Sequence, residues 1–140
     1  MKKIKKVQRK IDTVFAHCSD TRTNQSFGVA DFRKWHVEER GWSDVGYHYV
    51  IRLDGTVEEG RPLELIGAHA APCNTGSIGI CFEGGLRPSG KHWIQPTTKQ
   101  MSAWFTLYWR LCDTYGDLKI RGHYEVSDKT CPNFNVEILK

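Results

Sequence analysis

One amphipathic helix in the last third of the chain constrains the fold more than any other segment. It is predicted to run from the neighbourhood of Met101 to Tyr115, with Thr97 and Gln100 placed as a capping box ahead of it. Apolar and aromatic side chains recur through it at helical spacing, and Gly116 is placed to end it. The stripe predicts core packing rather than an aromatic cofactor site, so a second layer must cover it.

Short β-branched segments supply the second layer. Ile11–Ala16 is predicted as a buried strand that leads directly into His17. Further strands are predicted at Val45–Leu53, Ser77–Glu83 and Leu118–Arg121. Strands interleaved with helices predict an α/β domain with a central mixed β-sheet flanked by helices.

Two further local structures are expected between the strands. Val29–Arg40 has its apolar residues on one helical face, and Gly41 is placed to stop that helix. Asp54 and Gly55 are expected to form a two-residue hairpin turn with positive φ at both positions, from which Thr56–Glu59 returns.

Length and composition bound the domain organisation. The 140 residues suffice for one domain, and the 39% hydrophobic and 26% charged content excludes a disordered tail or a fibre. No apolar run approaches the roughly 18 residues of a membrane span, so no membrane insertion is expected. We expect a basic arm over residues 1–10 and a single domain over residues 11–140.

The arm holds six basic residues and no acid, whereas residues 11–140 hold 14 basic and 16 acidic side chains. Such an arm is either a solvated terminus or a contact for an anionic partner. It does not open a signal peptide, because polar residues from Gln8 to Asp12 interrupt any apolar stretch. We therefore expect a protein made and kept in a cytoplasm.

Cysteines and histidines carry the most specific chemistry in the sequence. The five cysteines are odd in number and form no CxxC pair, which indicates a reducing compartment rather than a disulfide framework. His123 and Cys131 lie eight residues apart, and either His17 or His69 could supply the third ligand of a catalytic metal site. Nitrogen and thiolate ligands favour zinc over magnesium or calcium.

Other common enzyme signatures are absent from the sequence. There is no GxSxG elbow, no GxxxxGK[ST] loop and no GxGxxG after a strand, which excludes hydrolase-fold esterases, P-loop NTPases and dinucleotide enzymes. The carboxylates are scattered, so a two-carboxylate glycosidase is unsupported.

Four strings occur in order over nearly the whole chain: "DTVFAHCSDT", "WHVEERGWSDVGYHYVIRLDGTVEEGRP", "IGAHA…NTGSIGICFEGG" and "RGHYEVSDKTCPNF". Together they resemble the zinc-dependent N-acetylmuramoyl-L-alanine amidases, in particular short phage endolysins with the fold of peptidoglycan recognition proteins. The resemblance implies one zinc ion per chain with His17, His123 and Cys131 as ligands. Non-catalytic recognition proteins of this fold lack the cysteine ligand, so Cys131 favours an enzyme.

The resemblance also implies roles for three other residues. Tyr47 and Lys129 match the family's remaining catalytic positions, and His69 matches a position that lines the substrate groove. The residues alone would suggest a half-buried strand tyrosine and a surface lysine. Donors of these types can stabilise the oxyanion that forms when an amide carbonyl is attacked.

Several nearby residues of metal-binding type are expected to be structural. Cys18 follows His17 directly, and consecutive strand residues project to opposite faces, so Cys18 should pack away from the metal. Cys81, Cys112, His36 and His48 are likewise expected in the core, whereas Asn74 and Thr75 are weaker candidates for substrate contact.

The resemblance implies hydrolysis of the amide between N-acetylmuramic acid and L-alanine in peptidoglycan, and lysis of the host at the end of phage infection. The expected protein is a monomer in the host cytoplasm that binds no nucleic acid directly and reaches periplasmic murein through a holin-type pore. Two alternatives stay open: regulatory binding to the phage RNA polymerase, with the basic arm as a contact, and peptidoglycan recognition without cleavage.

Overall fold

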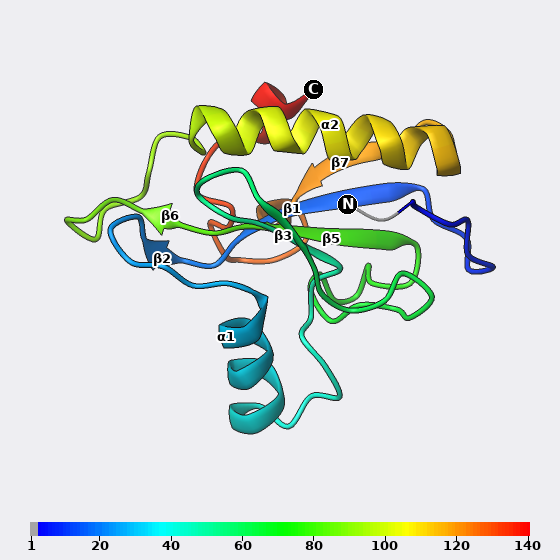
Figure 1. The fold of residues 1–140 in the computed structure, drawn as a ribbon, viewed down its shortest axis with the longest axis horizontal. Coiled ribbons are helices and arrows are strands. Elements are labelled where there is room, and N and C mark those ends of the chain that lie inside the picture. The colour runs from blue at the N-terminus through cyan, green and yellow to red at the C-terminus, as the bar shows by residue number, and fades with distance from the viewer. Residues whose placement is uncertain (1–2) are drawn as a thin grey trace.

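The computed structural model describes residues 3–140, so Met1 and Lys2 of the predicted arm lie outside the described residues. Figure 1 shows a sheet with the long helix α2 along one side and α1 projecting from the other. The elements in chain order are β1 (Thr13–Cys18), β2 (Thr21–Arg22), α1 (Val29–Lys34), η1 (Trp35–Glu39), β3 (Tyr49–Ile51), β4 (Val57–Glu59), β5 (Ser77–Phe82), β6 (Gly85–Leu86), α2 (Thr98–Tyr115), β7 (Lys119–Gly122), η2 (His123–Glu125) and η3 (Val136–Leu139).

The five-stranded sheet has the order β4-β3-β5-β1-β7. Strands β3, β5, β1 and β7 pair in parallel, and only the β3–β4 hairpin is antiparallel. A second, two-stranded sheet pairs β2 with β6. The predicted central mixed sheet flanked by helices is therefore confirmed.

The two faces of β1 and β5 carry different side chains, because successive strand residues point to opposite sides. Val14 and Ile78 lie on the face that packs under α2, with Trp104, Leu107 and Leu111 of the helix fully buried against it. The opposite face carries His17 and is covered by α1 and the loops around it. These two layers fix where the site can form.

The helix α2 follows its predicted signals closely. Thr97 accepts a hydrogen bond from the Gln100 backbone N–H, the Gln100 side chain bonds back to Thr97, and Gly116 ends the helix at φ 84°. Gln100 is fully buried, and its amide also donates to the Ile51 and Glu83 carbonyls. The capping box therefore also ties the helix start to the sheet.

The predicted helix over Val29–Arg40 is a shorter α-helix followed by one π-helical stretch. α1 ends at Lys34, and η1 continues to Glu39 before Gly41 turns the chain at φ 72°. The wider π turn brings His36 onto the buried face, where its Nδ1 accepts the Gly46 backbone N–H at 2.9 Å. This interior bond is the physical gain that accompanies the irregular turn.

The predicted strand over Val45–Leu53 and its hairpin turn are partly wrong. β3 begins only at Tyr49, because the Gly46 and Tyr47 carbonyls accept hydrogen bonds from loop residues rather than from a neighbouring strand. In the hairpin only Gly55 has positive φ, at 89°, and Arg52 pairs with Thr56 across a three-residue loop. The Asp54 carboxylate accepts the Thr56 N–H, which stabilises this longer turn.

The described part of the basic arm lies against the body of the protein. Ile4 and Val7 pack on the core, and the Tyr115 hydroxyl donates to the Lys5 carbonyl at 2.8 Å. The Arg9 guanidinium donates to the carbonyls of Leu63, Thr75 and Ser77. The lysine side chains of residues 3–10 remain exposed.

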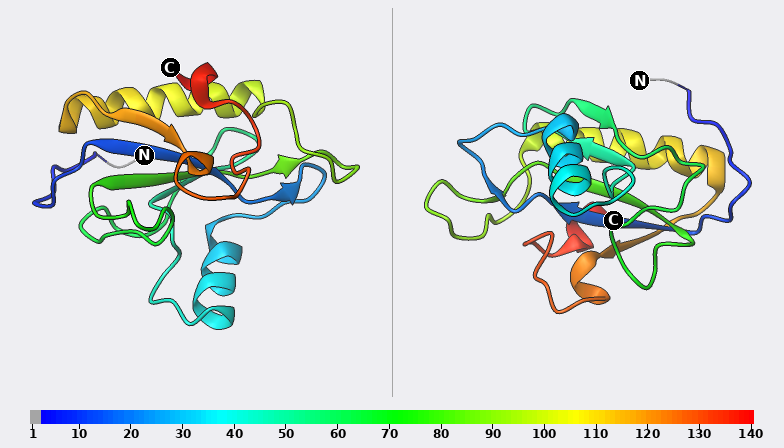
Figure 2. Two further views of the ribbon diagram at one scale, coloured as in Figure 1. Left: turned by 180° about the vertical axis from the view of Figure 1, so that it is seen from behind. Right: turned by 90° about the horizontal axis from the view of Figure 1, so that it is seen from below.

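Figure 2 shows the C-terminal turn η3 beside α2, on the far side of the sheet from α1. All five cysteines are free, as the sequence predicts. Within residues 3–140, no helix combines the length and the apolarity needed to cross a membrane.

Candidate metal centre and substrate groove

Neighbouring parallel strands deliver two of the three predicted ligands to the same edge of the sheet. Ala16 pairs with Gly122 between β1 and β7, so the residues that follow, His17 and His123, stand side by side with ring centroids 4.7 Å apart. Cys131 returns on the next loop, held there because its carbonyl accepts the Tyr124 N–H at 2.9 Å. One potential ligand atom from each of His17, His123 and Cys131 lies within 4.8 Å of the others.

The cluster fits a zinc ion in both chemistry and size. Two imidazoles and one thiolate are a donor set that zinc prefers, and a fourth position stays free for water or substrate. The His17 Nδ1 and Cys131 Sγ atoms are 3.8 Å apart. Tetrahedral zinc with ordinary bond lengths would hold such a pair at about 3.6 Å.

Cys131 sits among hydrogen-bond donors that favour its thiolate. Its sulfur accepts the Cys18 backbone N–H at 3.2 Å. Hydrogen bonds with Cys18 and with His123 hold the pKa of the Cys131 thiol well below its usual range, and they outweigh the opposing effect of burial. The pKa of Cys18 is raised by its hydrogen bond to Cys131 and by burial, so the two thiols have separate roles. Cys131 is the natural metal ligand of the pair.

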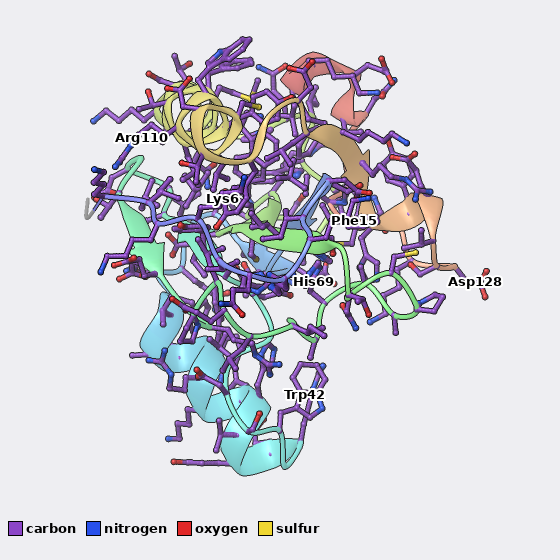
Figure 3. The ribbon with its side chains drawn as sticks, turned by 90° about the vertical axis from the view of Figure 1, so that its right-hand side faces the viewer. Lys6, Phe15, Trp42, His69, Arg110 and Asp128 are labelled. Carbon is purple, nitrogen blue, oxygen red and sulfur yellow. The ribbon has the colours of Figure 1, made fainter. Side chains whose placement is uncertain are left out.

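His17 presents opposite ring nitrogens to the metal site and to the protein interior. Its Nδ1 faces Cys131, whereas its Nε2 lies 2.9 Å from the Nδ1 atom of His69. Burial lowers the pKa of both histidines, so both rings are neutral near pH 7. Figure 3 shows His69 close under the sheet, on the side of α1.

A groove of about 600 Å³ opens over the cluster. Tyr47 and Lys129 both line it, and the Tyr47 ring lies 5.1 Å from that of His17. Burial raises the pKa of the Tyr47 hydroxyl well above its ordinary value, so it remains a hydrogen-bond donor at neutral pH. Lys129 is exposed to solvent. The groove thus brings together all five residues that the resemblance assigns to metal binding and catalysis.

The remaining candidates have other positions. His69 lines the groove but is only 7% exposed, and its role in substrate contact stays a prediction. Asn74 supports the His69 loop, since its side-chain oxygen accepts the backbone N–H groups of His69 and Ala70. Thr75 accepts a hydrogen bond from Arg9 through its carbonyl and does not line the groove.

The predicted structural residues are largely where the sequence placed them. Cys18 packs in the α2-side core, and Cys81 packs with Val29 and Phe32 on the other face. His48 is buried and its Nδ1 accepts the Gly79 N–H at 3.0 Å. Cys112 is half-buried against the α2-side core.

Two residues that line the groove were not predicted from the sequence. Trp42 lies beside α1 in Figure 3 and lines the groove together with Arg40, whose guanidinium carbon is 5.3 Å from the indole centroid. Neither residue belongs to a regular element, and both reach the groove only because the chain turns back at Gly41. The signal was present only as two large side chains flanking a glycine.

Comparison with known proteins identifies the family to which a protein with this groove belongs. The profile of the N-acetylmuramoyl-L-alanine amidase family matches residues 7–134. The chain belongs to this amidase family. It is also 42% identical over 132 residues to the endolysin of Escherichia phage T7, covering 94% of this chain and 87% of that protein.

Solved structures agree with this assignment. The endolysin amidase LysCS from Clostridium intestinale superposes with a TM-score of 0.81 at 29% identity, covering 94% of this chain and 82% of that one. Drosophila PGRP-LB superposes with a TM-score of 0.75 at 29% identity, covering 92% and 78%. The expected endolysin-type amidase with the fold of peptidoglycan recognition proteins is confirmed, and peptidoglycan amide hydrolysis is its activity.

Proposed function

We propose that this amidase uses one zinc ion, held by His17, His123 and Cys131, to cleave the amide between the lactyl group of N-acetylmuramic acid and L-alanine. The observation that carries the proposal is the cluster of two imidazoles and one thiolate at the floor of an open groove. When bound, zinc would supply Lewis-acid activation of water and of the scissile carbonyl near neutral pH. The residues around the cluster supply the remaining chemistry.

Tyr47 is proposed as a hydrogen-bond donor to the oxygen that becomes negatively charged during attack. Its ring is fixed by contacts with His17 and Phe32, and its hydroxyl keeps its proton because burial raises its pKa. A donor that is already oriented stabilises developing charge without reorganisation at the moment of reaction. Tyr47 can also pass a proton to the leaving amine.

Lys129, which also lines the groove, is proposed to bring positive charge to the same oxygen. Its backbone N–H donates to the Ser127 hydroxyl at 3.2 Å, which fixes the loop, while its side chain is free to swing toward a substrate. An ammonium near the carbonyl favours the oxyanion over the neutral ground state. Either Lys129 or Tyr47 could protonate the amine, and their variants separate the two roles.

We further propose that the enzyme acts in host lysis and crosses the inner membrane through a holin-type pore. The phage endolysin relatives support this role. Regulatory binding to a phage RNA polymerase has no comparable support. The Ile4, Val7 and Arg9 side chains, which the structure places against the body, are engaged within the chain itself. Recognition without cleavage is disfavoured by the complete ligand set.

The decisive experiment is turbidity clearing of outer-membrane-permeabilised Gram-negative cells, with and without a chelator. Released material is then assayed for new amino groups on L-alanine. We expect lysis that a chelator abolishes and added zinc restores, with L-alanine as the new amino terminus. Lysis that exposes new reducing sugars instead, or that is insensitive to a chelator, would contradict the proposal.

A further inference from the structure

The polar groups behind His17 form a directed chain that leads away from the metal site. His17 Nε2 meets His69 Nδ1 at 2.9 Å, and His69 Nε2 meets the Ser77 hydroxyl at 3.4 Å. The Ser77 hydroxyl in turn donates to the Cys73 carbonyl at 2.8 Å. His17, His69 and Ser77 are all buried, so water does not compete for these hydrogen bonds.

The direction of every proton in this chain follows from its last link. A carbonyl accepts only, so the Ser77 hydroxyl proton is committed to Cys73, and the Ser77 oxygen accepts the N–H from His69 Nε2. A neutral His69 then carries its lone pair on Nδ1 and must accept from His17 Nε2–H. His17 in this tautomer has a bare Nδ1, which is the nitrogen that faces Cys131.

The ring of His69 is held in place by its surroundings as well as by these bonds. A Cβ atom added at Gly79 would lie 2.6 Å from His69 Cγ, and one added at Gly67 would lie 2.6 Å from His69 Cδ2. The Asn74 side-chain oxygen accepts the His69 backbone N–H at 3.0 Å, which fixes the backbone at this position. Two glycines therefore leave a slot into which the imidazole fits closely.

We propose that His69 is a positioning residue that selects the metal-binding tautomer of His17, and that Ser77 selects the tautomer of His69. The inference rests on the proposed zinc site and deepens it. Its role differs from the substrate contact predicted for His69, because the relevant atoms point at His17 and Ser77 rather than at the groove. Partners of this type raise metal affinity by orienting the ligand and increasing its basicity.

The test measures zinc affinity by competition with a chromophoric chelator, using a matched pair of substitutions. In His69→Asn the side-chain oxygen takes the place of Nδ1 and can still accept from His17, whereas the amide of His69→Gln lies nearer Nε2 and cannot. We expect His69→Gln and His69→Leu to weaken zinc binding by about 10- to 100-fold. We expect His69→Asn to stay within about threefold of the parent, and Ser77→Ala to fall between them.

His36→Leu is the control. Like the His69 variants it removes a buried histidine, but His36 accepts the Gly46 backbone N–H and does not contact a proposed metal ligand. It should lower stability without altering zinc affinity. Visible absorption of the Co²⁺-loaded proteins reports the coordination directly. Should His69→Leu fail to fold, the Asn and Gln variants and Ser77→Ala still decide the question.

The outcomes separate the two proposals. Parent-like zinc affinity in both the Gln and Leu variants, or equal loss in the Asn and Gln variants, would overturn the role of His69 and leave the zinc enzyme intact. A parent protein that binds no zinc at all would overturn the proposed metal centre itself.

Discussion

The two faces of the central sheet are built from the same strands yet have opposite characters. Toward α2, β1 and β5 present only apolar side chains and the Cys18 thiol: Val14, Ala16, Cys18, Ile78, Ile80 and Phe82. Toward α1 they present Thr13, Phe15, His17, Ser77, Gly79 and Cys81. The first face stabilises the domain by burial, whereas the second positions a reactive cluster.

The difference shows how buried polar groups are accommodated. On the α2 face, Trp104 Nε1 is a buried polar atom without a hydrogen-bond partner. On the α1 face, the buried histidines form hydrogen bonds through their ring nitrogens. His17 bonds to the His69 ring, His36 to the Gly46 backbone N–H, and His48 to the Gly79 backbone N–H. Polar burial is stable there because hydrogen bonds replace the lost water.

Loss of the thiolate ligand should have the largest effect on the α1 face. We expect Cys131→Ala to contain no stoichiometric zinc and to lyse cells only at background level, because two imidazoles alone hold the metal weakly. Elemental analysis and turbidity clearing measure the two outcomes. Cys112→Ala, a half-buried cysteine on α2, is the matched control and should keep one zinc per chain. Full zinc content in Cys131→Ala would show that Cys131 is not a zinc ligand and that the α1 face does not hold the metal in the proposed way.

A truncation on the α2 face should affect stability instead. Leu107 is fully buried, so Leu107→Ala is expected to lower the free energy of unfolding by about 2–5 kcal/mol through lost contacts and a residual cavity. Urea denaturation measures the change. Zinc affinity of the folded variant should match the parent, and a weakened metal site would show that the two faces are coupled.

The groove walls should affect the reaction without affecting metal content. Tyr47→Phe and Lys129→Ala are each expected to keep one zinc and to lose about 10²-fold or more of the hydrolysis rate, as for loss of one transition-state donor. Amino-group release from purified peptidoglycan measures the rate. Near-parent activity in either variant would remove that residue from the mechanism.

Acid should lower the stability of the chelated protein through the buried histidines on its α1 face. Burial lowers the pKa of His36 and of His48 to about 4, below the value of about 6.5 in an unfolded chain. Between these values the unfolded chain binds protons that the folded protein does not, so stability is lost as the pH falls below about 6.5. Each of the two histidines should lower the free energy of unfolding by about 2 kcal/mol at pH 5 relative to pH 7.

Denaturation at pH 7 and pH 5 measures this loss. His36→Asn keeps a side-chain oxygen to accept the Gly46 N–H but has no proton to gain, so its stability should depend less on pH than that of the parent. An unchanged pH dependence would show that His36 titrates normally.

Cys18→Ala should have the smallest effect and separates spatial position from sequence adjacency. The Cys18 side chain packs in the α2-side core, and both its thiol and its backbone N–H are hydrogen-bonded to Cys131. The substitution removes the bond from the thiol but keeps the backbone N–H and all three candidate ligands, so zinc content and activity should stay near the parent values while stability falls by about 1 kcal/mol. Loss of zinc in this variant would show that the Cys18 thiol itself belongs to the metal site.

Regular elements were predictable from the sequence where local chemistry agrees with the fold. The capping box at Thr97, the strand into His17 and the opposite orientation of Cys18 all follow from short-range rules and are seen in the structure. The fold and the amidase activity followed from a resemblance spread over most of the chain. The candidate metal ligands were identified from that resemblance, since spacing alone left both His17 and His69 open as the third ligand.

The failures occur where distant contacts override local preference. The chain from Val45 to His48 has strand-like composition, yet its backbone is held by Arg61 and Ala68 in an irregular loop. The π turn at His36 depends on a hydrogen bond to Gly46, ten residues away. The link from His69 to Ser77 likewise exists only after the strands have paired, so periodicity could not reveal it.

The parallel pairing of β1 with β7 also decides when this enzyme comes into being. His17 and Cys131 are separated by 114 positions, and the ligand cluster forms only once β7 has joined β1 at the edge of the sheet. Because a chain emerges from the ribosome with its N-terminus first, a polypeptide that ends before residue 123 carries only His17 of the three candidate ligands. The candidate metal centre can therefore form only after the chain has been made as far as Cys131.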